Sequence, residues 1–166
     1  MSPVTDLVAD LDIELDRLWE AQDAREQRRA LRATLATLYE LRCYREDHTP
    51  PTKLAYYNRA AACPDGHVTE GILLLRGALI HDVTKPYSPQ TKTVYLGSTT
   101  FPGKYTYPQT NLLWRTEDEI KQHLRPDVLS DICYPSYVSQ VAGQPVLTTL
   151  KIARDFLVSD PHLPPL

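Results

Sequence analysis

The first part of the chain has the hydrophobic pattern of an amphipathic helix. Its leucines recur at steps of three and four residues, the spacing of one helix face: Leu7, Leu11, Leu15 and Leu18. This pattern predicts a helix over residues 5–23. It resumes from Ala30 to Leu41, and neither glycine nor proline interrupts the stretch before Pro50. The two patterns therefore belong either to one long kinked helix or to two helices with an arginine-rich joint near residues 22–29.

Prolines divide the next part of the chain. The cluster Thr49-Pro50-Pro51 ends the preceding helix, because a residue before proline is disfavoured in the α conformation. A short helix over residues 52–62 follows, and then a turn at Pro64-Asp65-Gly66. The strongest helical pattern runs from His67 to about Asp82 and is apolar around nearly its whole circumference. Such a helix is buried, so we expect it at the centre of a helical bundle.

The pattern changes between residues 84 and 126. Five prolines, two glycines and many threonines and tyrosines replace the helical periodicity. Residues 93–96 and 104–107 are typical of short strands around Phe101-Pro102-Gly103, which predicts a small β-hairpin. A structureless loop of this length inside a compact domain is uncommon, so the alternative to a hairpin is a functional flap.

Helical periodicity returns near the end of the chain. A helical segment over residues 134–142 is broken by Gly143, and Pro145 opens an amphipathic helix that runs to Leu157. The proline-rich residues 161–166 form a tail.

Composition agrees with one globular domain. The chain has 166 residues, of which 42% are apolar and 23% charged, close to the averages for soluble domains. No apolar run approaches the ~20 residues of a membrane helix, and no secretory leader opens the sequence. Cys43, Cys63 and Cys133 include no C-x-x-C pair, which is typical of reduced thiols. We therefore expect one mainly α domain over residues 1–160, located in the cytoplasm, with an irregular or β-hairpin insertion around residues 85–125.

Arginine is unevenly distributed. The net charge is −3 and the isoelectric point about 5.9. Seven of the 12 arginines nevertheless lie between Arg17 and Arg45, where four acids leave a local charge of +3. The usual explanation is a solvated helix face with i,i+4 ion pairs, and the alternative is a surface that contacts phosphates.

Candidate chemistry is concentrated in the apolar helix. The sequence contains no H-E-x-x-H, Walker, G-x-G-x-x-G or G-x-S-x-G motif, and we expect neither a metal nor another cofactor. Arg76 and His81 interrupt the most apolar segment, where an unpaired ionisable group is costly. In a structural explanation, Arg76 pairs with a carboxylate such as Glu70 or Asp82, and the helix C-terminus favours protonated His81.

In a catalytic explanation, Arg76 and His81 act on a phosphodiester. The histidine accepts the proton of an RNA 2′-hydroxyl near neutral pH, and the arginine stabilises the charge on the phosphate. Five residues place the two side chains about 140° apart on an ideal helix. They converge only if the helix end unwinds or if a second protomer supplies the partner, so the catalytic explanation requires a dimer.

An Arg-x4-His motif on a helix of a small α-bundle resembles the HEPN superfamily, named for its occurrence in higher eukaryotes and prokaryotes. The resemblance rests on Arg76 and His81. It implies a four- to five-helix bundle that dimerises with the two motifs at the interface. It also implies a metal-independent endoribonuclease that acts as a toxin or phage-defence effector, with RNA as substrate and an antitoxin or a nucleotidyltransferase as candidate partner.

Position in the chain separates this pair from a chance match. With 12 arginines and five histidines, about one match to the three usual spacings is expected by chance. Arg42-x5-His48 is such a second match, but it lies in a charged, solvated stretch.

Residues after the motif, most of them in the insertion, have supporting roles in this hypothesis. Asp82 would orient His81, and Lys85 would contact phosphate. The aromatic residues would stack on RNA bases: Tyr95, Tyr105, Tyr107 and Trp114. We expect Tyr134 and Tyr137 in the core or at an interface.

Two alternatives remain open. The first is a catalytically silent module of the same fold that acts through a protein partner. It is favoured by Gly77, where many HEPN proteins have a polar residue. The second is a structural or regulatory helical protein in which Arg76 forms a buried ion pair.

Overall fold

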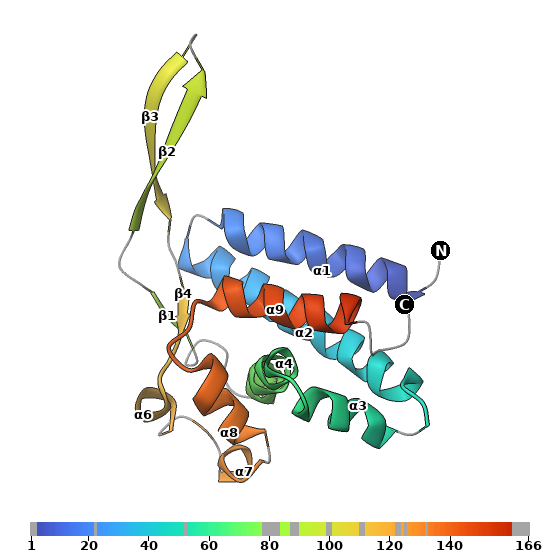
Figure 1. Cartoon of the computed structure of the whole chain (residues 1–166). Coiled ribbons are helices and arrows are strands. Elements are labelled where there is room, and N and C mark those ends of the chain that lie inside the picture. The colour runs from blue at the N-terminus through green and yellow to red at the C-terminus, as the bar shows by residue number, and fades with distance from the viewer. Residues whose placement is uncertain are drawn as a thin grey trace.

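The structure is a computed structural model of the chain. It describes all residues except 1–2, 22, 52, 78–83, 87–89, 99–100, 110–111, 122–123, 125, 132 and 161–166. At residues 3, 77, 85–86, 90–98 and 101–109 it describes the backbone alone. The described chain is mainly helical, as the hydrophobic pattern predicts, and Figure 1 shows how the helices are arranged.

Two long helices, α1 (Pro3–Glu20) and α2 (Ala24–His48), pack against each other along one side of the molecule (Figure 1). Asp23 determines where the second one starts. Its Oδ1 atom accepts the backbone N–H groups of Arg25 at 2.7 Å and Glu26 at 2.9 Å, which caps the helix. The stretch therefore forms two separate helices and not one long kinked helix.

The next two helices follow the proline pattern only in part. α3 (Lys53–Ala61) confirms the short helix predicted there. The turn predicted at Pro64-Asp65-Gly66 is wrong, because Pro64 begins α4 (Pro64–Leu74). Proline is accommodated at this position because the first turn of a helix requires no N–H from it.

Glycines let α4 approach its neighbours closely. A Cβ atom on Gly66 would lie 2.2 Å from the carbonyl oxygen of Ala60 in α3. A Cβ atom on Gly71 would lie 2.8 Å from the backbone nitrogen of Tyr137. Both distances are shorter than any side chain tolerates, so α4 is fixed against backbone on two sides.

The central position predicted for this helix is confirmed, but its predicted end is not. Figure 1 shows α4 end-on, surrounded by α3, α8 (Tyr134–Ser136) and α9 (Val146–Ser159). The α-helix ends at Leu74, and one 3₁₀ turn, η1 (Leu75–Gly77), follows. The remainder of the predicted helix, residues 78–82, lies outside the described residues.

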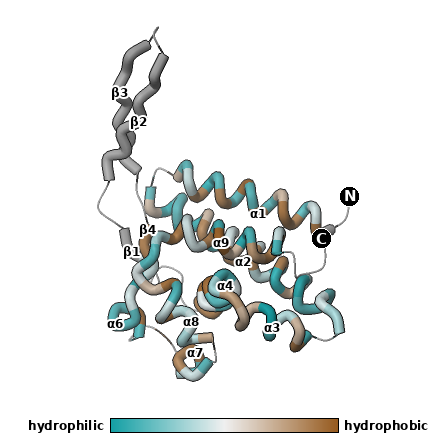
Figure 2. The backbone as a smooth tube through the Cα atoms, viewed as in Figure 1, coloured by the Kyte–Doolittle hydropathy of each residue, from teal (hydrophilic) through white to brown (hydrophobic). Residues whose placement is uncertain are grey.

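The C-terminal part closes the core. The helical segment predicted before Gly143 is present as α8 and a π-helical turn, η2 (Tyr137–Val141), and Gly143 ends it with a φ of 75°. Pro145 caps α9, as predicted. Hydrophobic and hydrophilic residues alternate along α1, α2 and α9 in Figure 2, as in helices with one buried face. Tyr137 is fully buried and Tyr134 packs against the core, in line with the sequence expectation.

The insertion contains the predicted hairpin. β2 (Gln90–Ser98) pairs antiparallel with β3 (Phe101–Gln109), with Val94 opposite Tyr105. The strands are longer than predicted, and the chain reverses between Ser98 and Phe101 instead of around Pro102. Prolines fit in β3 because each strand of a two-stranded ribbon has an unpaired edge. Figure 1 shows the ribbon extending away from the helices.

A second, shorter pair of strands joins the insertion to the bundle. β1 (Thr84–Pro86) pairs antiparallel with β4 (Leu112–Trp114). Trp114 is fully buried, and its indole N–H donates to Oγ1 of Thr149 in α9 at 2.7 Å. The ladder therefore ends on an anchored side chain.

Three short helices connect β4 to the core: α6 (Glu117–Ile120), α7 (Pro126–Leu129) and α8. The sequence analysis did not predict α6. A capping box marks its start, since the backbone N–H of Thr116 donates to the Glu119 carboxylate at 2.8 Å. In the part of the chain that the structure describes, no helix has the length and apolar character needed to cross a bilayer.

Candidate nucleic-acid interface

Arg76 lies at the surface, just after the buried part of α4. Leu75 is fully buried, whereas Arg76 is exposed, because the 3₁₀ turn brings the chain out of the core. The expectation that Arg76 is buried is therefore wrong. Its proposed pairing with Glu70 is also wrong, because the side chain turns instead toward α2. The guanidinium carbon lies over the ring of Tyr39, 3.6 Å from its centroid.

This contact leaves Arg76 suited to bind an anion. A guanidinium that lies on an aromatic face is held in place, and its N–H groups still point outward in their plane. Among the residues that the structure describes, no carboxylate or carbonyl oxygen accepts a hydrogen bond from the Arg76 side chain. An oxyanion can therefore reach these donors without displacing a partner in the described chain.

The other predicted site residues are less well defined. His81 and Asp82 lie outside the described residues. Lys85 lies in β1 opposite Leu113, and its side chain is not described. The same applies to the tyrosines of the hairpin: Tyr95 in β2, and Tyr105 and Tyr107 in β3. The base-stacking role predicted for Trp114 is wrong, because a fully buried indole bonded to Thr149 is not available to a nucleotide.

The second motif match, Arg42 and His48, does not form a site. Arg42 is bound to Glu46 and Glu70 in the interior. His48 is exposed and stacks on Tyr44, with 3.9 Å between the ring centroids. The two side chains therefore serve different structural contacts.

The arginines between residues 17 and 45 fall into two groups. Those in the first group have structural partners. Arg17 pairs with Glu14 at 2.5 Å, and the buried Arg45 donates to the carbonyl oxygen of Leu157 at the end of α9. Arg42 belongs to this group too. The second group consists of exposed side chains near the start of α2, Arg25, Arg28, Arg29 and Arg32, of which Arg32 also has an interaction partner. We call this second group the arginine face.

The arginine face is one continuous strip on α2. Its residues follow one another at steps of three and four, so their side chains lie next to each other on the helix surface. The same face continues through Ala36 to Tyr39, seven residues after Arg32. A rise of 1.5 Å per residue places Tyr39 about 21 Å along the helix from Arg25. The guanidinium groups of the face end at Arg32, and Arg76, which lies over Tyr39, adds another one about 10.5 Å farther along the helix.

This strip destabilises the helix that carries it. Four pairs of arginines are neighbours at i,i+3 or i,i+4, and at about 0.2–0.5 kcal/mol each they cost roughly 1–2 kcal/mol together. The positive end of the helix dipole adds to the cost. Within the described chain, Arg25, Arg28 and Arg29 do not form the i,i+4 ion pairs expected from the sequence. The three side chains are exposed, as a solvated face requires, but the ion pairs expected with it are found elsewhere in the stretch, at Arg42 and Glu46.

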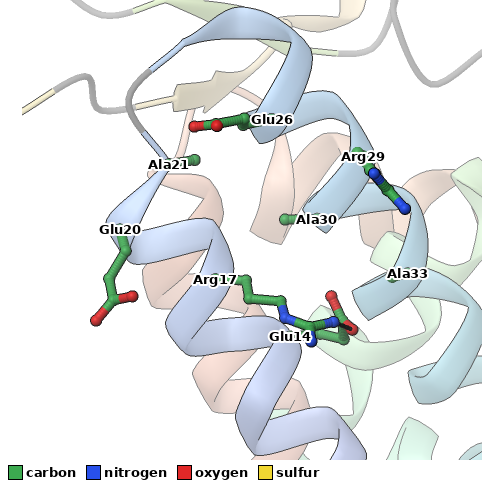
Figure 3. Close-up of a pocket in the computed structure, with 8 residues that line it drawn as sticks. All are labelled: Glu14, Arg17, Glu20, Ala21, Glu26, Arg29, Ala30 and Ala33. Atoms are coloured by element: carbon green, nitrogen blue, oxygen red, sulfur yellow. Dashed lines mark hydrogen bonds and ion pairs between the residues drawn. The ribbon is translucent and has the colours of Figure 1, made fainter.

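Nearby acids are directed elsewhere. Asp23 caps the helix, and the backbone N–H groups of Glu26 and Arg25 lower the pKa of its carboxyl group. Figure 3 shows a hollow between α1 and α2, in which Glu26 and Arg29 point to opposite sides and Arg17 is engaged by Glu14. A separate hollow is lined by the arginine face and Ala33. The second hollow therefore carries only positive charge.

A buried polar cluster lies at the other end of α2, and sequence reasoning did not identify it. Glu70 accepts a hydrogen bond from the Tyr56 hydroxyl at 2.9 Å and forms an ion pair with Arg42 at 3.3 Å. Burial alone would lower the pKa of Arg42, but the carboxylate of Glu70 outweighs it and the pKa is raised. Arg42 also donates to the hydroxyl of Tyr57 at 2.5 Å. The cluster ties α2, α3 and α4 together.

Cys133 lies beside this cluster and is not an activated nucleophile. Its thiol is 4.0 Å from Glu70. Burial, and then the charge of Glu70, raise the pKa of Cys133 to about 12. A nucleophilic cysteine requires the opposite shift, toward the thiolate at neutral pH. The cluster is therefore structural.

No family model matches the chain, and no curated protein and no solved structure is significantly similar to it. Nor do the described residues contain a group of three or more His, Cys, Asp and Glu side chains that would hold a metal ion. Function must therefore be argued from the site itself.

Proposed function

We propose that the protein binds RNA and cleaves it without a metal ion, as a dimer of the HEPN type. The observation that carries this proposal is the exposed guanidinium of Arg76, which lies on Tyr39 with no hydrogen-bonding partner among the described residues. Arginine presents a fixed fork of donors that fits two oxygens of one phosphate. The biological role that fits this chemistry is that of a toxin or phage-defence effector controlled by an antitoxin or a nucleotidyltransferase.

Cleavage of this kind needs two functions at the phosphate. His81 of one protomer would accept the proton of a ribose 2′-hydroxyl, and the 2′-oxygen would then attack phosphorus. The bond from phosphorus to the 5′-oxygen breaks, and a protonated His81 of the second protomer would donate a proton to that oxygen. Arg76 would stabilise the charge that develops on the phosphate. The products are a 2′,3′-cyclic phosphate and a 5′-hydroxyl end.

Supporting residues have narrower roles in the proposal. Asp82 would orient His81, and Lys85 would add a further cation for phosphate. Tyr105 and Tyr107 would stack on bases, a role that Trp114 does not share.

A second candidate is RNA binding without cleavage. It is favoured by the end of the α-helix at Leu74, because Arg76 then lies on a 3₁₀ turn and not on the α-helix that the HEPN resemblance implies for it. In this case the protein would act as a regulatory module through a partner protein.

The test is a product analysis with matched variants. Wild-type protein, His81→Ala and Arg76→Ala are incubated with a single-stranded RNA in the presence of EDTA, and the new ends are identified by mass spectrometry. We expect cyclic-phosphate ends from the wild type and none from His81→Ala. His48→Ala serves as control, because His48 is an exposed histidine away from the proposed site.

The outcomes separate the candidates. Cleavage that persists in His81→Ala at the wild-type rate contradicts the ribonuclease proposal. Binding by the wild type with no cleavage supports the silent module. A protein that stays monomeric while it cleaves contradicts the composite site, and sedimentation at the assay concentration measures this.

A further inference from the structure

We propose that the arginine face binds the phosphates of a single-stranded RNA and leads that strand to Arg76. The route to Arg76 rests on the proposed function, whereas the binding does not require cleavage. The residues involved are Arg25, Arg28, Arg29 and Arg32 of α2, which line a hollow with Ala33.

The geometry of the face suits a chain of phosphates. Along the helix axis the four arginines occupy three levels about 4.5–6 Å apart, Arg25, then the adjacent Arg28 and Arg29, then Arg32, over about 10.5 Å in all. This interval is comparable with the distance between successive phosphates of one nucleic-acid strand. The helix continues for about 10.5 Å from Arg32 to Tyr39, where Arg76 adds one more guanidinium. An extended strand can therefore meet a cation at each of several phosphates.

The composition of the face favours a nucleic acid over an acidic protein. Its hollow is lined by four arginines and one alanine. Protein interfaces place apolar or aromatic anchors at their centre, and this face offers none. Arginine forks match phosphate oxygens, and a row of cations is the electrostatic footprint of a single-strand binding surface.

The rest of the molecule carries an excess of negative charge, so a nucleic-acid strand would bind at the arginine face. The net charge of the chain is −3, so the whole molecule does not attract polyanions without discrimination. Of the acids beside the face, Asp23 caps α2, and Glu26, which is exposed next to Arg25, has an interaction partner of its own. A polyanion is therefore attracted to this strip and not to the molecule at large.

The experiment measures binding in a form that cleavage cannot disturb. The probe is a fluorescent 2′-O-methyl oligouridine of about 12 nucleotides, a length within the ~4–16 nucleotides of single-strand sites. It has no free 2′-hydroxyl and cannot be cut. Fluorescence anisotropy gives the affinity of the full chain at several salt concentrations.

The decisive variant is the double substitution Arg28→Gln and Arg29→Gln. Each phosphate contact contributes about 0.7 to the slope of log affinity against log salt, so two lost contacts lower the slope by about 1.4. At 0.1 M salt this corresponds to a loss of affinity of about 25-fold. The matched control is Arg17→Gln, the same substitution one helix away on an arginine that is already paired, and it should bind like the wild type.

Two results would overturn the inference. One is a double variant that binds the probe with the affinity and salt slope of the wild type. The other is polyglutamate competing as strongly as the oligouridine, since the face would then recognise acidic protein. The folded state of the double variant is checked by its thermal midpoint, which should not fall, because the substitutions remove like-charge neighbours.

Failure of this inference is distinct from failure of the proposed function. If the probe binds through the arginine face but unmodified RNA is not cleaved, the binding surface stands and the ribonuclease proposal fails. If RNA is cleaved through His81 while the double variant binds normally, the opposite holds.

Discussion

Replacing Glu70 by glutamine removes one negative charge from the interior and leaves the shape of the side chain almost unchanged. The carboxylate pairs with Arg42 at 3.3 Å and accepts the Tyr56 hydroxyl at 2.9 Å, so both contacts are affected. In the variant, the amide oxygen can still accept from Tyr56. The amide N–H₂ group then faces the guanidinium, which is a contact between two donors.

The size of the effect follows from what Arg42 keeps. Breaking a fully buried ion pair costs about 3–5 kcal/mol. Here the side chains of Arg42 and Glu70 remain 13% and 10% exposed, and Arg42 retains Glu46 and Tyr57 as partners. A lost hydrogen bond to a charged group, about 1.5–3 kcal/mol, is the better guide. We therefore expect Glu70→Gln to lower the free energy of unfolding by about 2–3 kcal/mol.

The assay is urea unfolding followed by circular dichroism, with the thermal midpoint as a second measurement. For a chain of this size, about 2–4 °C is lost per kcal/mol, so the midpoint should fall by roughly 4–12 °C. Glu46→Gln is the matched control. It removes the other carboxylate of Arg42, in an i,i+4 pair with side chains 13% and 16% exposed, and should cost no more than about 1 kcal/mol.

The reasoning is refuted if the free energy of unfolding of Glu70→Gln lies within about 0.5 kcal/mol of the wild-type value, the range typical of surface substitutions. It is also refuted if Glu46→Gln is the more damaging variant. Either outcome would mean that Arg42 and not Glu70 is the centre of the cluster.

Three further outcomes are expected. Gly66→Ala should destabilise by about 1–3 kcal/mol in chemical unfolding, because its Cβ would meet the backbone of Ala60 at 2.2 Å; a neutral or stabilising result would contradict the close contact. Cys133→Ala should flatten the alkaline loss of stability. The folded pKa is raised from 9.0 to about 12, so in the wild type the thiol favours folding below pH 9 and this contribution disappears between pH 9 and 12. An unchanged alkaline slope in unfolding titrations would count against this assignment, and Cys43→Ala is the control. Trp114→Phe removes the hydrogen bond to Thr149 and should lower unfolding free energy by about 1 kcal/mol or more, while RNA binding measured by anisotropy should not change.

Local patterns predicted most of the helices. α1, α2, α3 and α9 follow from the spacing of leucines and from prolines at their ends, because a single helix needs only its own sequence to place its apolar face. The 3₁₀ turn that follows Leu74 could not be predicted in this way, because periodicity registers apolar positions and not a change from α to 3₁₀ hydrogen bonding.

The candidate site could be predicted only in part, because its contacts are distant in sequence. Arg76 was expected in the core, yet a ring 37 positions earlier, Tyr39, holds it at the surface. The partner of Glu70 is Arg42, 28 positions away. The excess of arginine at the start of α2 was visible from composition, but which of these residues lack ion pairs depends on how α1 and α9 pack. The role of His81 and membership of the HEPN superfamily stay predictions.

The insertion leaves the helical body and returns to it at one place. Pro86 and Leu112 are paired across the β1–β4 ladder, where opposite backbones are only about 5 Å apart. A two-residue turn closes such a gap. The intervening ribbon is thus a detachable accessory: excising it and closing the ladder with such a turn would leave the buried indole of Trp114 and the helices in place.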